Sequence, residues 1–162
     1  MTKPELRKLY ATELLAANAD ELERSNQLLG KHLLYLIHDK GLKHICCYQP
    51  LTKLREPDIT PVISHLAHSP EIMLTIIHPR ADTPLPQGSF DLIIAPMLAF
   101  DSAGNRLGRG GGWYDKFIAS QPQALNIGVA YALQQADNIP TEPHDQKLDY
   151  IVTEQGIINI ET

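Results

Sequence analysis

The chain has 162 residues, of which 43% are hydrophobic and 20% charged, and its formal net charge is −5 at pH 7. This composition is typical of one globular domain, here residues 1–162, and the negative charge disfavours a nucleic-acid-binding surface. No apolar run reaches the roughly 20 residues that span a bilayer, and residues 1–5 lack the apolar core of a secretory signal. We therefore expect a cytoplasmic monomer that binds neither nucleic acid nor membranes.

The first 40 residues predict two helices, over residues 4–17 and 19–40. Asp20 with Glu23 forms a capping-box pattern at the start of the second helix, and Gly41 is a typical residue for its end. Apolar residues recur on one face of this helix at helical spacing. They are Leu22, Leu29, Leu33, Leu36 and Ile37.

Beyond residue 43 the pattern changes to short apolar runs separated by polar segments, which predict strands. The predicted strands cover residues 44–48, 72–77, 90–95 and 126–131, with a closing pair at 150–153 and 156–160. Helices are predicted after Asp58, which would act as the cap, and over residues 114–120. Residues 80–89 contain two prolines and a glycine, so they predict a loop. Cys46 and Cys47 would point to opposite faces of their strand, which predicts two buried free thiols.

This alternation of strands and helices predicts an α/β fold with three layers, α/β/α, around a mostly parallel sheet. The strand at 90–95 is apolar on both faces, which favours a central position in the sheet. Ligands of such sheets bind beyond the carboxyl ends of the strands, so we expect the functional site in the segments that follow them.

A glycine-rich segment follows the central strand and has five glycines between Gly104 and Gly112. Glycine allows positive φ angles and close approach of a ligand to the main chain, and successive N–H groups then converge on an anion. A helix starting near Trp113 would present its positive end to the same anion. Arg106 and Arg109 add charges suited to phosphate, and a carboxylate in the first helical turn could hold Mg²⁺. The segment is neither a Walker A loop nor a dinucleotide fingerprint, and a flexible turn with solvated arginines is the alternative.

The segment from Asp91 to Asp115 closely resembles the hallmark of the 5-formyltetrahydrofolate cyclo-ligases, also called methenyltetrahydrofolate synthetases. That hallmark is a D-L-I-I-x-P strand, an A-F-D turn and then R-L-G-x-G-x-G-Y-Y-D. Further segments of the chain are similar to the family. They are residues 3–7, 48–50 with 56–58, 126–131, Gln134 and 143–145. The resemblance implies the cyclo-ligase fold, which is NagB-RpiA-CoA-transferase-like. It also implies ATP- and Mg²⁺-dependent conversion of 5-formyltetrahydrofolate to 5,10-methenyltetrahydrofolate through a phosphorylated formyl group.

The resemblance also assigns roles to particular residues. It places Arg106 and Arg109 at the reacting groups and Mg²⁺ at Asp115 and Asp145. The implied ATP contacts are Lys3, Arg7, Arg106, Leu107, Gly108, Arg109, Gly110, Gly111, Gly112, Trp113 and Tyr114. The implied folate contacts are Leu51, Glu56, Arg109 and Trp113.

Each assignment has a simpler alternative. Lys3 and Arg7 would suit a solvated helix face, Asp145 a turn cap, and Glu56 a surface ion pair with Arg55. The histidines, including His65 and His68, have no carboxylate or cysteine partners at ligand spacing and are expected to be surface or core residues.

Two departures from the family pattern leave the substrate open. Trp113 stands where the family usually has tyrosine, and the loop at residues 78–89 is shorter than usual. A related ATP-dependent enzyme for another formylated or pterin-like compound, or a non-catalytic folate- or nucleotide-binding module, therefore stays an alternative.

Overall fold

The computed structural model describes residues 1–160, in which six strands form one sheet in the order β2-β1-β3-β6-β7-β8. All neighbouring strands are parallel except β7 and β8, which are antiparallel. The strands of this sheet are β1 (His44–Tyr48), β2 (Met73–Ile77), β3 (Leu92–Pro96), β6 (Leu125–Val129), β7 (Tyr150–Thr153) and β8 (Gly156–Asn159). The mostly parallel sheet, the central place of β3 and the closing hairpin are confirmed.

The helices and one small ribbon complete the fold. The helices are α1 (Lys3–Ala16), α2 (Ala19–Lys40), α3 (Thr60–Ala67) and α4 (Trp113–Ala119), with short 3-10 turns η1 (Thr52–Leu54) and η2 (Ala132–Gln134). An antiparallel ribbon joins β4 (Ala99–Phe100) to β5 (Arg106–Leu107). This ribbon was not predicted, because two-residue strands are too short to produce an alternating pattern. It holds the start of the glycine-rich segment against the end of β3, since Leu98 N–H donates to the Leu107 carbonyl at 2.8 Å.

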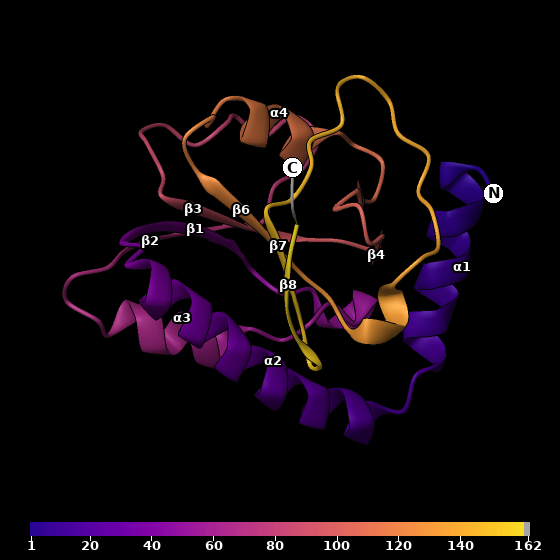
Figure 1. The fold of residues 1–162 in the computed structure, drawn as a ribbon, viewed down its shortest axis with the longest axis horizontal. Coiled ribbons are helices and arrows are strands. Elements are labelled where there is room, and N and C mark those ends of the chain that lie inside the picture. Colours follow the sequence, from indigo (N-terminus) through magenta and orange to yellow (C-terminus); the bar gives the residue numbers. More distant parts are fainter. Residues whose placement is uncertain (161–162) are drawn as a thin grey trace.

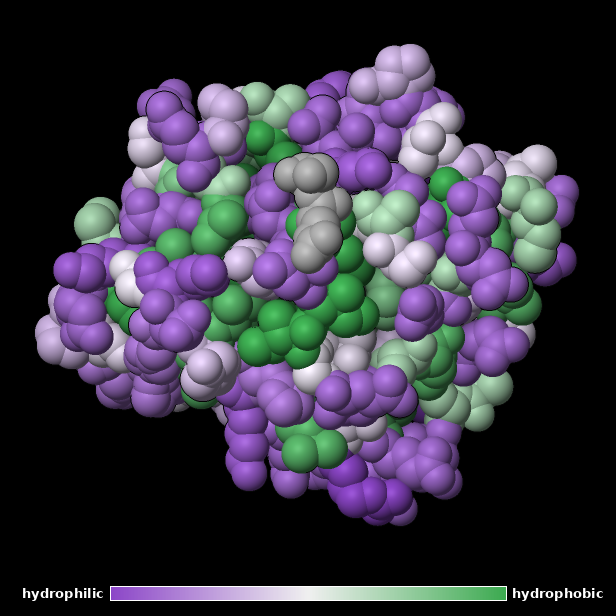
Figure 2. Space-filling model, viewed as in Figure 1, coloured by the Kyte–Doolittle hydropathy of each residue, from purple (hydrophilic) through white to green (hydrophobic). Residues whose placement is uncertain are grey.

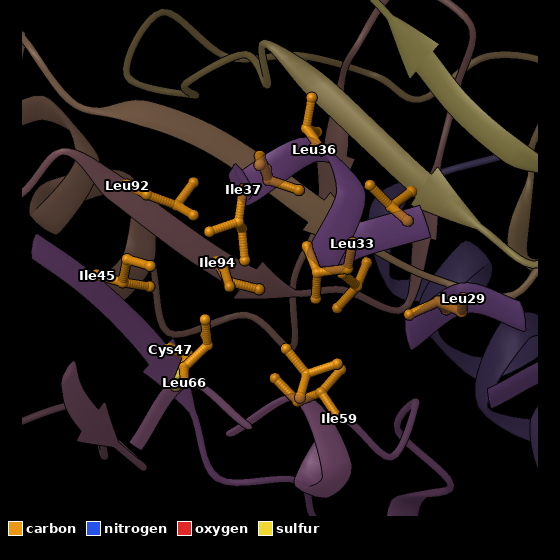
Figure 3. Packing of buried hydrophobic residues seen from close by; sticks show 14 of the residues in the cluster. Leu29, Leu33, Leu36, Ile37, Ile45, Cys47, Ile59, Leu66, Leu92 and Ile94 are labelled. Carbon is orange, nitrogen blue, oxygen red and sulfur yellow. The ribbon is translucent and has the colours of Figure 1, made fainter. Parts of the chain in front are cut away.

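The helices cover both faces of the sheet, with α4 above it and α2 and α3 below it in Figure 1. On the lower face the apolar side chains of α2 and α3 pack against those of β1 and β3, as Figure 3 shows. On the upper face α4 packs Trp113, Tyr114 and Phe117 against Cys46, Ile93 and Ala95 of the sheet. The predicted three-layer α/β/α arrangement is therefore confirmed.

The ends of the helices correct two sequence predictions. The cap of α2 is Asn18, whose Oδ1 accepts from Glu21 N–H at 3.1 Å, and the predicted cap Asp20 already lies in the first turn. Asp58 lies one residue before the cap of α3, although its carboxylate does accept from Thr60 N–H at 3.0 Å. Gly41 ends α2 in the left-handed conformation, as predicted, with φ 63°.

Cys46 and Cys47 are both buried and free, and they join the cores on opposite faces of the sheet. Burial raises the pKa of each thiol to about 12, so both stay protonated at neutral pH. The prediction of two buried free thiols is confirmed.

The surface seen in Figure 2 is mostly hydrophilic at its margins, with an apolar strip over the β7–β8 hairpin. Ile157 and Ile158 of β8 are only half-buried, as is common on an edge strand. Within residues 1–160, no helix combines the length and the apolarity that a membrane span requires.

Candidate functional site

A cleft of about 810 Å³ lies where β1, β2 and β3 reach their carboxyl ends. The residues that directly follow or end these strands, at 48–49, 78–81 and 96–97, form part of its wall. This is the position that the topology of a parallel sheet favours for a ligand. The cleft also brings together every residue for which the sequence predicted a role. These residues are Lys3, Arg7, Leu51, Glu56, Arg106, Leu107, Gly108, Arg109, Gly110, Gly111, Gly112, Trp113, Tyr114, Asp115 and Asp145.

The glycine-rich segment crosses the cleft between β5 and α4. Gly110 and Gly112 have φ angles of 113° and 68°, which side chains rarely allow, so these two positions favour glycine. From α1, Arg7 donates its Nε–H to the Gly108 carbonyl at 3.0 Å. Helix α1 therefore holds the glycine-rich segment in place, so this segment is not the flexible turn that was the alternative interpretation.

Arg106 lines the cleft and is held in place by two contacts. Its Nε–H donates to the Pro96 carbonyl at 3.0 Å, and its guanidinium carbon lies 5.0 Å from the centroid of the Tyr114 ring. Burial lowers the pKa of Arg106, while the nearby Asp115 carboxylate acts in the opposite direction. An arginine keeps its charge under such conditions, so the cleft contains a fixed, partly desolvated cation.

The Tyr114 hydroxyl is buried and has no hydrogen-bond partner within residues 1–160. Burial is also the main reason why the pKa of this phenol is raised. A buried hydroxyl without a partner is unusual, and Tyr114 lines the cleft. The hydroxyl is therefore a place where a bound molecule or water would complete the hydrogen bonding.

Glu56 forms an ion pair with Arg109 across the cleft, with 3.7 Å between Glu56 Oε1 and Arg109 Nε. The Glu56 side chain is only 5% exposed, and its second oxygen accepts from Leu51 N–H at 3.2 Å. Burial raises the pKa of Glu56, and the Leu51 N–H and Arg109 oppose that shift. The alternative partner Arg55 points elsewhere, since its guanidinium donates to the Ala17 carbonyl at 2.6 Å.

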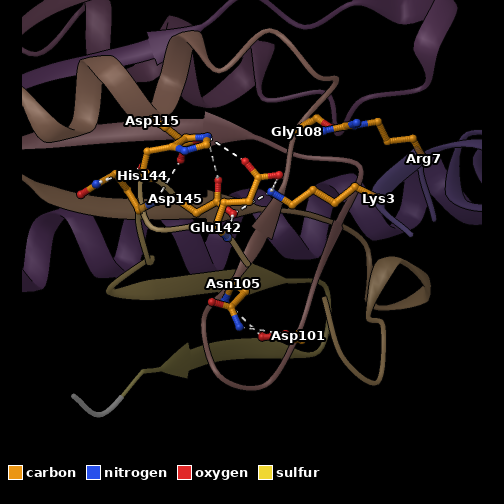
Figure 4. A network of polar contacts seen from close by, with 10 residues as sticks. Lys3, Arg7, Asp101, Asn105, Gly108, Asp115, Glu142, His144 and Asp145 are labelled. Atoms are coloured by element: carbon orange, nitrogen blue, oxygen red, sulfur yellow. Dashed lines mark hydrogen bonds and ion pairs between the residues drawn. The ribbon is translucent and has the colours of Figure 1, made fainter. Parts of the chain in front are cut away.

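A second ion pair joins the first helix to the turn before β7 (Figure 4). Lys3 Nζ lies 2.6 Å from Asp145 Oδ2 and 3.8 Å from Glu142 Oε1, and the Lys3 side chain is 15% exposed. Burial raises the pKa of Asp145, but the Lys3 ammonium and the Glu142 N–H outweigh that effect, and the net pKa lies below the ordinary value. Asp145 thus caps a turn, as its alternative proposed, and also pairs with Lys3.

Asp115 faces the same part of the cleft from the first turn of α4. Its Oδ1 accepts from Gln146 N–H at 3.0 Å, next to Asp145 in the chain. Within residues 1–160 there is no group of three or more His, Cys, Asp or Glu side chains that could hold a metal ion. A metal in this cleft would therefore need ligands beyond these two carboxylates.

Trp113 connects the glycine-rich segment to the short loop over residues 78–89. Its indole Nε1–H donates to the Thr83 carbonyl at 2.8 Å, and the residue is 7% exposed. The ring packs against Tyr114 and Phe117. Tryptophan at this position therefore anchors the loop as well as forming part of the cleft wall.

Sequence reasoning assigned no role to several residues that line the cleft. They are Pro4, Tyr48, Gln49, His78, Pro79, Arg80, Ala81, Pro96, Met97, Glu142 and His144. Most of them follow or end a predicted strand at the carboxyl edge of the sheet. Those residues could have been found from the sequence, because ligands of parallel sheets bind beyond the carboxyl ends of the strands.

Fold and site together define an α/β protein with a cation-rich cleft at the carboxyl edge of a parallel sheet. The profile of the 5-formyltetrahydrofolate cyclo-ligase family matches residues 75–154. A 5-formyltetrahydrofolate cyclo-ligase from Haemophilus influenzae is 29% identical over 90% of this chain and 92% of its own length.

Two solved structures have the same fold over nearly their whole length. A 5,10-methenyltetrahydrofolate synthetase from Mycoplasma pneumoniae matches with a TM-score of 0.84 and 25% identity, covering 95% of this chain and 99% of that one. A 5,10-methenyltetrahydrofolate synthetase from Aquifex aeolicus matches with a TM-score of 0.81 and 26% identity, covering 100% of this chain and 94% of that one. The chain belongs to the 5-formyltetrahydrofolate cyclo-ligase family.

Proposed function

We propose that this protein uses ATP to convert 5-formyltetrahydrofolate to 5,10-methenyltetrahydrofolate. In this reaction the formyl oxygen takes the γ-phosphoryl group of ATP, N10 then bonds to the activated carbon, and phosphate leaves with that oxygen. The observation that carries the proposal is the single cleft in which the glycine-rich segment, with Arg106 and Arg109, faces the buried Glu56. Membership of the cyclo-ligase family supports it.

The nucleotide half of the proposed site is formed by α1 and the glycine-rich segment. Phosphoryl transfer depends mainly on positioning and on stabilising charge. We assign phosphate contacts to the main-chain N–H groups of residues 107–114 and to the cations Lys3, Arg7 and Arg106. The fixed position of Arg106 against Pro96 and Tyr114 favours this role, because a preorganised charge need not be ordered when the substrate binds.

We assign a magnesium ion to Asp115 and Asp145. Both carboxylates line the cleft, and Asp145 already accommodates a cation, since the Lys3 ammonium lies 2.6 Å from it. Magnesium usually takes only one or two protein carboxylates and keeps water and phosphate oxygens as its other ligands. When bound, the ion would neutralise charge on the phosphates.

The folate half lies across the cleft. We assign Glu56 to accept hydrogen bonds from the N–H groups of the pterin, with Leu51 and Trp113 as apolar wall. Arg109 belongs to the glycine-rich segment but pairs with Glu56 at 3.7 Å, so it lies between the two halves. That place suits a cation that stabilises charge on the formyl oxygen as it is phosphorylated.

A related pterin-like substrate is the second candidate. The loop over residues 78–89 is short, and the Trp113–Thr83 hydrogen bond ties it to the glycine-rich segment. A tied, short loop would leave the folate half of the cleft with a different boundary from that of longer family members. This candidate predicts ATP hydrolysis without formation of the methenyl product.

The decisive experiment incubates the protein with 5-formyltetrahydrofolate, ATP and Mg²⁺, and omits each in turn. The proposal predicts that methenyl absorbance rises only in the complete mixture, with one ADP released per product. Absorbance that rises without ATP, or ATP use without product, would contradict it.

The metal assignment is tested separately with Asp115→Asn. Asparagine keeps an oxygen that can accept from Gln146 N–H, so stability should change little while Mg²⁺-dependent turnover falls. Equal losses of stability and turnover would remove Asp115 from the metal site.

A further inference from the structure

A residue with a strained backbone stands directly before Glu56. Within residues 1–160, Arg55 is the one residue other than glycine with a positive φ angle, at φ 55° and ψ 34°. Glycine and asparagine adopt this left-handed conformation more readily than a long side chain does. Arg55 ends the turn η1, where its N–H donates to the Thr52 carbonyl at 3.1 Å. A strained backbone persists only where surrounding contacts hold it.

The Arg55 side chain supplies such a contact. Its guanidinium donates to the Ala17 carbonyl at 2.6 Å, and the residue is half-buried. Ala17 is the cap at the carboxyl end of α1, where unpaired carbonyls carry a partial negative charge that favours a cation. Hydrogen bonds from a charged donor are among the strong ones in proteins. Arg55 therefore fastens the end of η1 to the end of α1.

The two sides of Glu56 are held in different ways. After Glu56 the chain is fixed within the core, since the buried Tyr48 hydroxyl donates to the Pro57 carbonyl at 2.9 Å. Before Glu56, residues 51–53 are exposed. The guanidinium of Arg55 thus provides the polar tie on that side, and it sets the direction in which the chain enters Glu56.

We propose that Arg55 is a positioning residue for Glu56. The guanidinium, bonded to α1, holds the left-handed turn from which the Glu56 side chain enters the cleft. This inference rests on the proposed function, in which Glu56 accepts hydrogen bonds from the pterin. Helix α1 also carries Lys3 and Arg7 into the nucleotide half, so through Arg55 one helix positions groups in both halves of the cleft.

The first test measures the position of Glu56 without any substrate. Burial raises the pKa of the Glu56 carboxyl in the unliganded protein. Arg55→Gly accepts φ 55° without strain but lacks the guanidinium, so Glu56 should reach solvent and its pKa should fall to the ordinary value. A pH titration followed by ¹³C NMR of the Glu56 carboxyl measures this change. A pKa that stays unchanged would overturn the proposal. So would a pKa that rises, because loss of a nearby charge alone acts in that direction.

The second test uses turnover. Arg55→Gly should raise KM for 5-formyltetrahydrofolate by about tenfold, because the lost hydrogen bond has a charged donor, and it should leave KM for ATP near the wild-type value. Arg55→Lys keeps a cation that can donate to the Ala17 carbonyl, so it should recover most of the affinity for the folate. Lys53→Ala removes an exposed charge from the same turn and is the matched control, which should change neither KM.

The two tests separate this inference from the proposed function. Equal rises in both KM values of Arg55→Gly, together with a lower melting temperature, would show a general structural role and overturn the proposal. If the wild-type protein forms no methenyl product, the proposed function fails, while the titration of Glu56 still decides whether Arg55 positions it.

Discussion

Replacing Arg106 with lysine should separate the role of its charge from that of its shape. The substitution keeps a cation but removes the Nε–H that donates to the Pro96 carbonyl at 3.0 Å and the planar group that lies 5.0 Å from the Tyr114 ring. A hydrogen bond from a charged donor contributes about 1.5–3 kcal/mol, and a cation–π contact about 0.5–2 kcal/mol. Because the lysine ammonium recovers part of both, we expect a net loss of about 2 kcal/mol in the free energy of unfolding.

The same substitution should reduce kcat/KM for ATP. Lysine cannot present two parallel N–H groups to phosphate oxygens, and a loss of about 2 kcal/mol in transition-state binding corresponds to roughly 30-fold. The measurements are urea unfolding followed by circular dichroism, and methenyl formation at varied ATP. Arg24→Lys, on the exposed surface of α2, is the matched control and should change neither quantity. If Arg106→Lys loses stability but keeps the wild-type kcat/KM for ATP, Arg106 supports the fold and does not contact phosphate.

Three further predictions follow from single contacts. Tyr114→Phe removes a buried hydroxyl that has no partner within residues 1–160, so unfolding in urea should show no loss of stability. A higher KM for one substrate would identify that substrate as the partner of the hydroxyl. A clear loss of stability would show that the hydroxyl is bonded in the unliganded protein. Gly128→Ala should destabilise the protein by about 1–3 kcal/mol, because a Cβ there would lie 2.6 Å from Leu148 Cδ1. Gly111→Ala is the control and should unfold at the wild-type urea concentration, because a Cβ at residue 111 would have no other atom within 4 Å. The lowered pKa of Asp145 means that its ionised form stabilises the fold at neutral pH. The stability difference between wild type and Asp145→Asn should therefore shrink as the pH falls below about 4. A difference that grows in acid would refute the ion pair with Lys3.

The sheet could be predicted from the sequence because its strands have strong local signals. Leu92 to Ala95 are apolar on both faces, which indicated a central parallel strand, and the glycines after it indicated a ligand loop. Local signals compete at the helix ends. Asn18 and Asp20 are both good caps, and only the backbone conformation at Asn18, extended with φ −68° and ψ 123°, decides between them.

The contacts of the site depend on residues that are far apart in the chain. Lys3 and Asp145 are 142 positions apart, and no periodicity relates them. The resemblance to the cyclo-ligases placed both in one site, but it did not indicate that they pair with each other. The same limit applies to His38 of α2 and His65 of α3, whose Nε2 atoms lie 3.4 Å apart only because the two helices pack on the same face of the sheet. The glycine-rich pattern and the resemblance to the cyclo-ligases therefore predicted many of the residues that line the cleft, whereas the partner of each charge required the fold.

These pairings have a consequence for how ligands would enter the cleft. Lys3 and Arg109, both proposed to meet substrate, already neutralise Asp145 and Glu56, which are proposed to meet the metal and the pterin. A buried charge without a partner is strongly destabilising, so the unliganded cleft is held together by the same groups that are proposed to bind the ligands. We expect binding to exchange partners: phosphate would replace Asp145 beside Lys3, while the metal would replace Lys3 beside Asp145. Lys3→Ala removes one member of such a pair. It should then weaken ATP binding less than the loss of a phosphate-binding cation alone would, because Asp145 no longer has to leave Lys3 before it binds Mg²⁺.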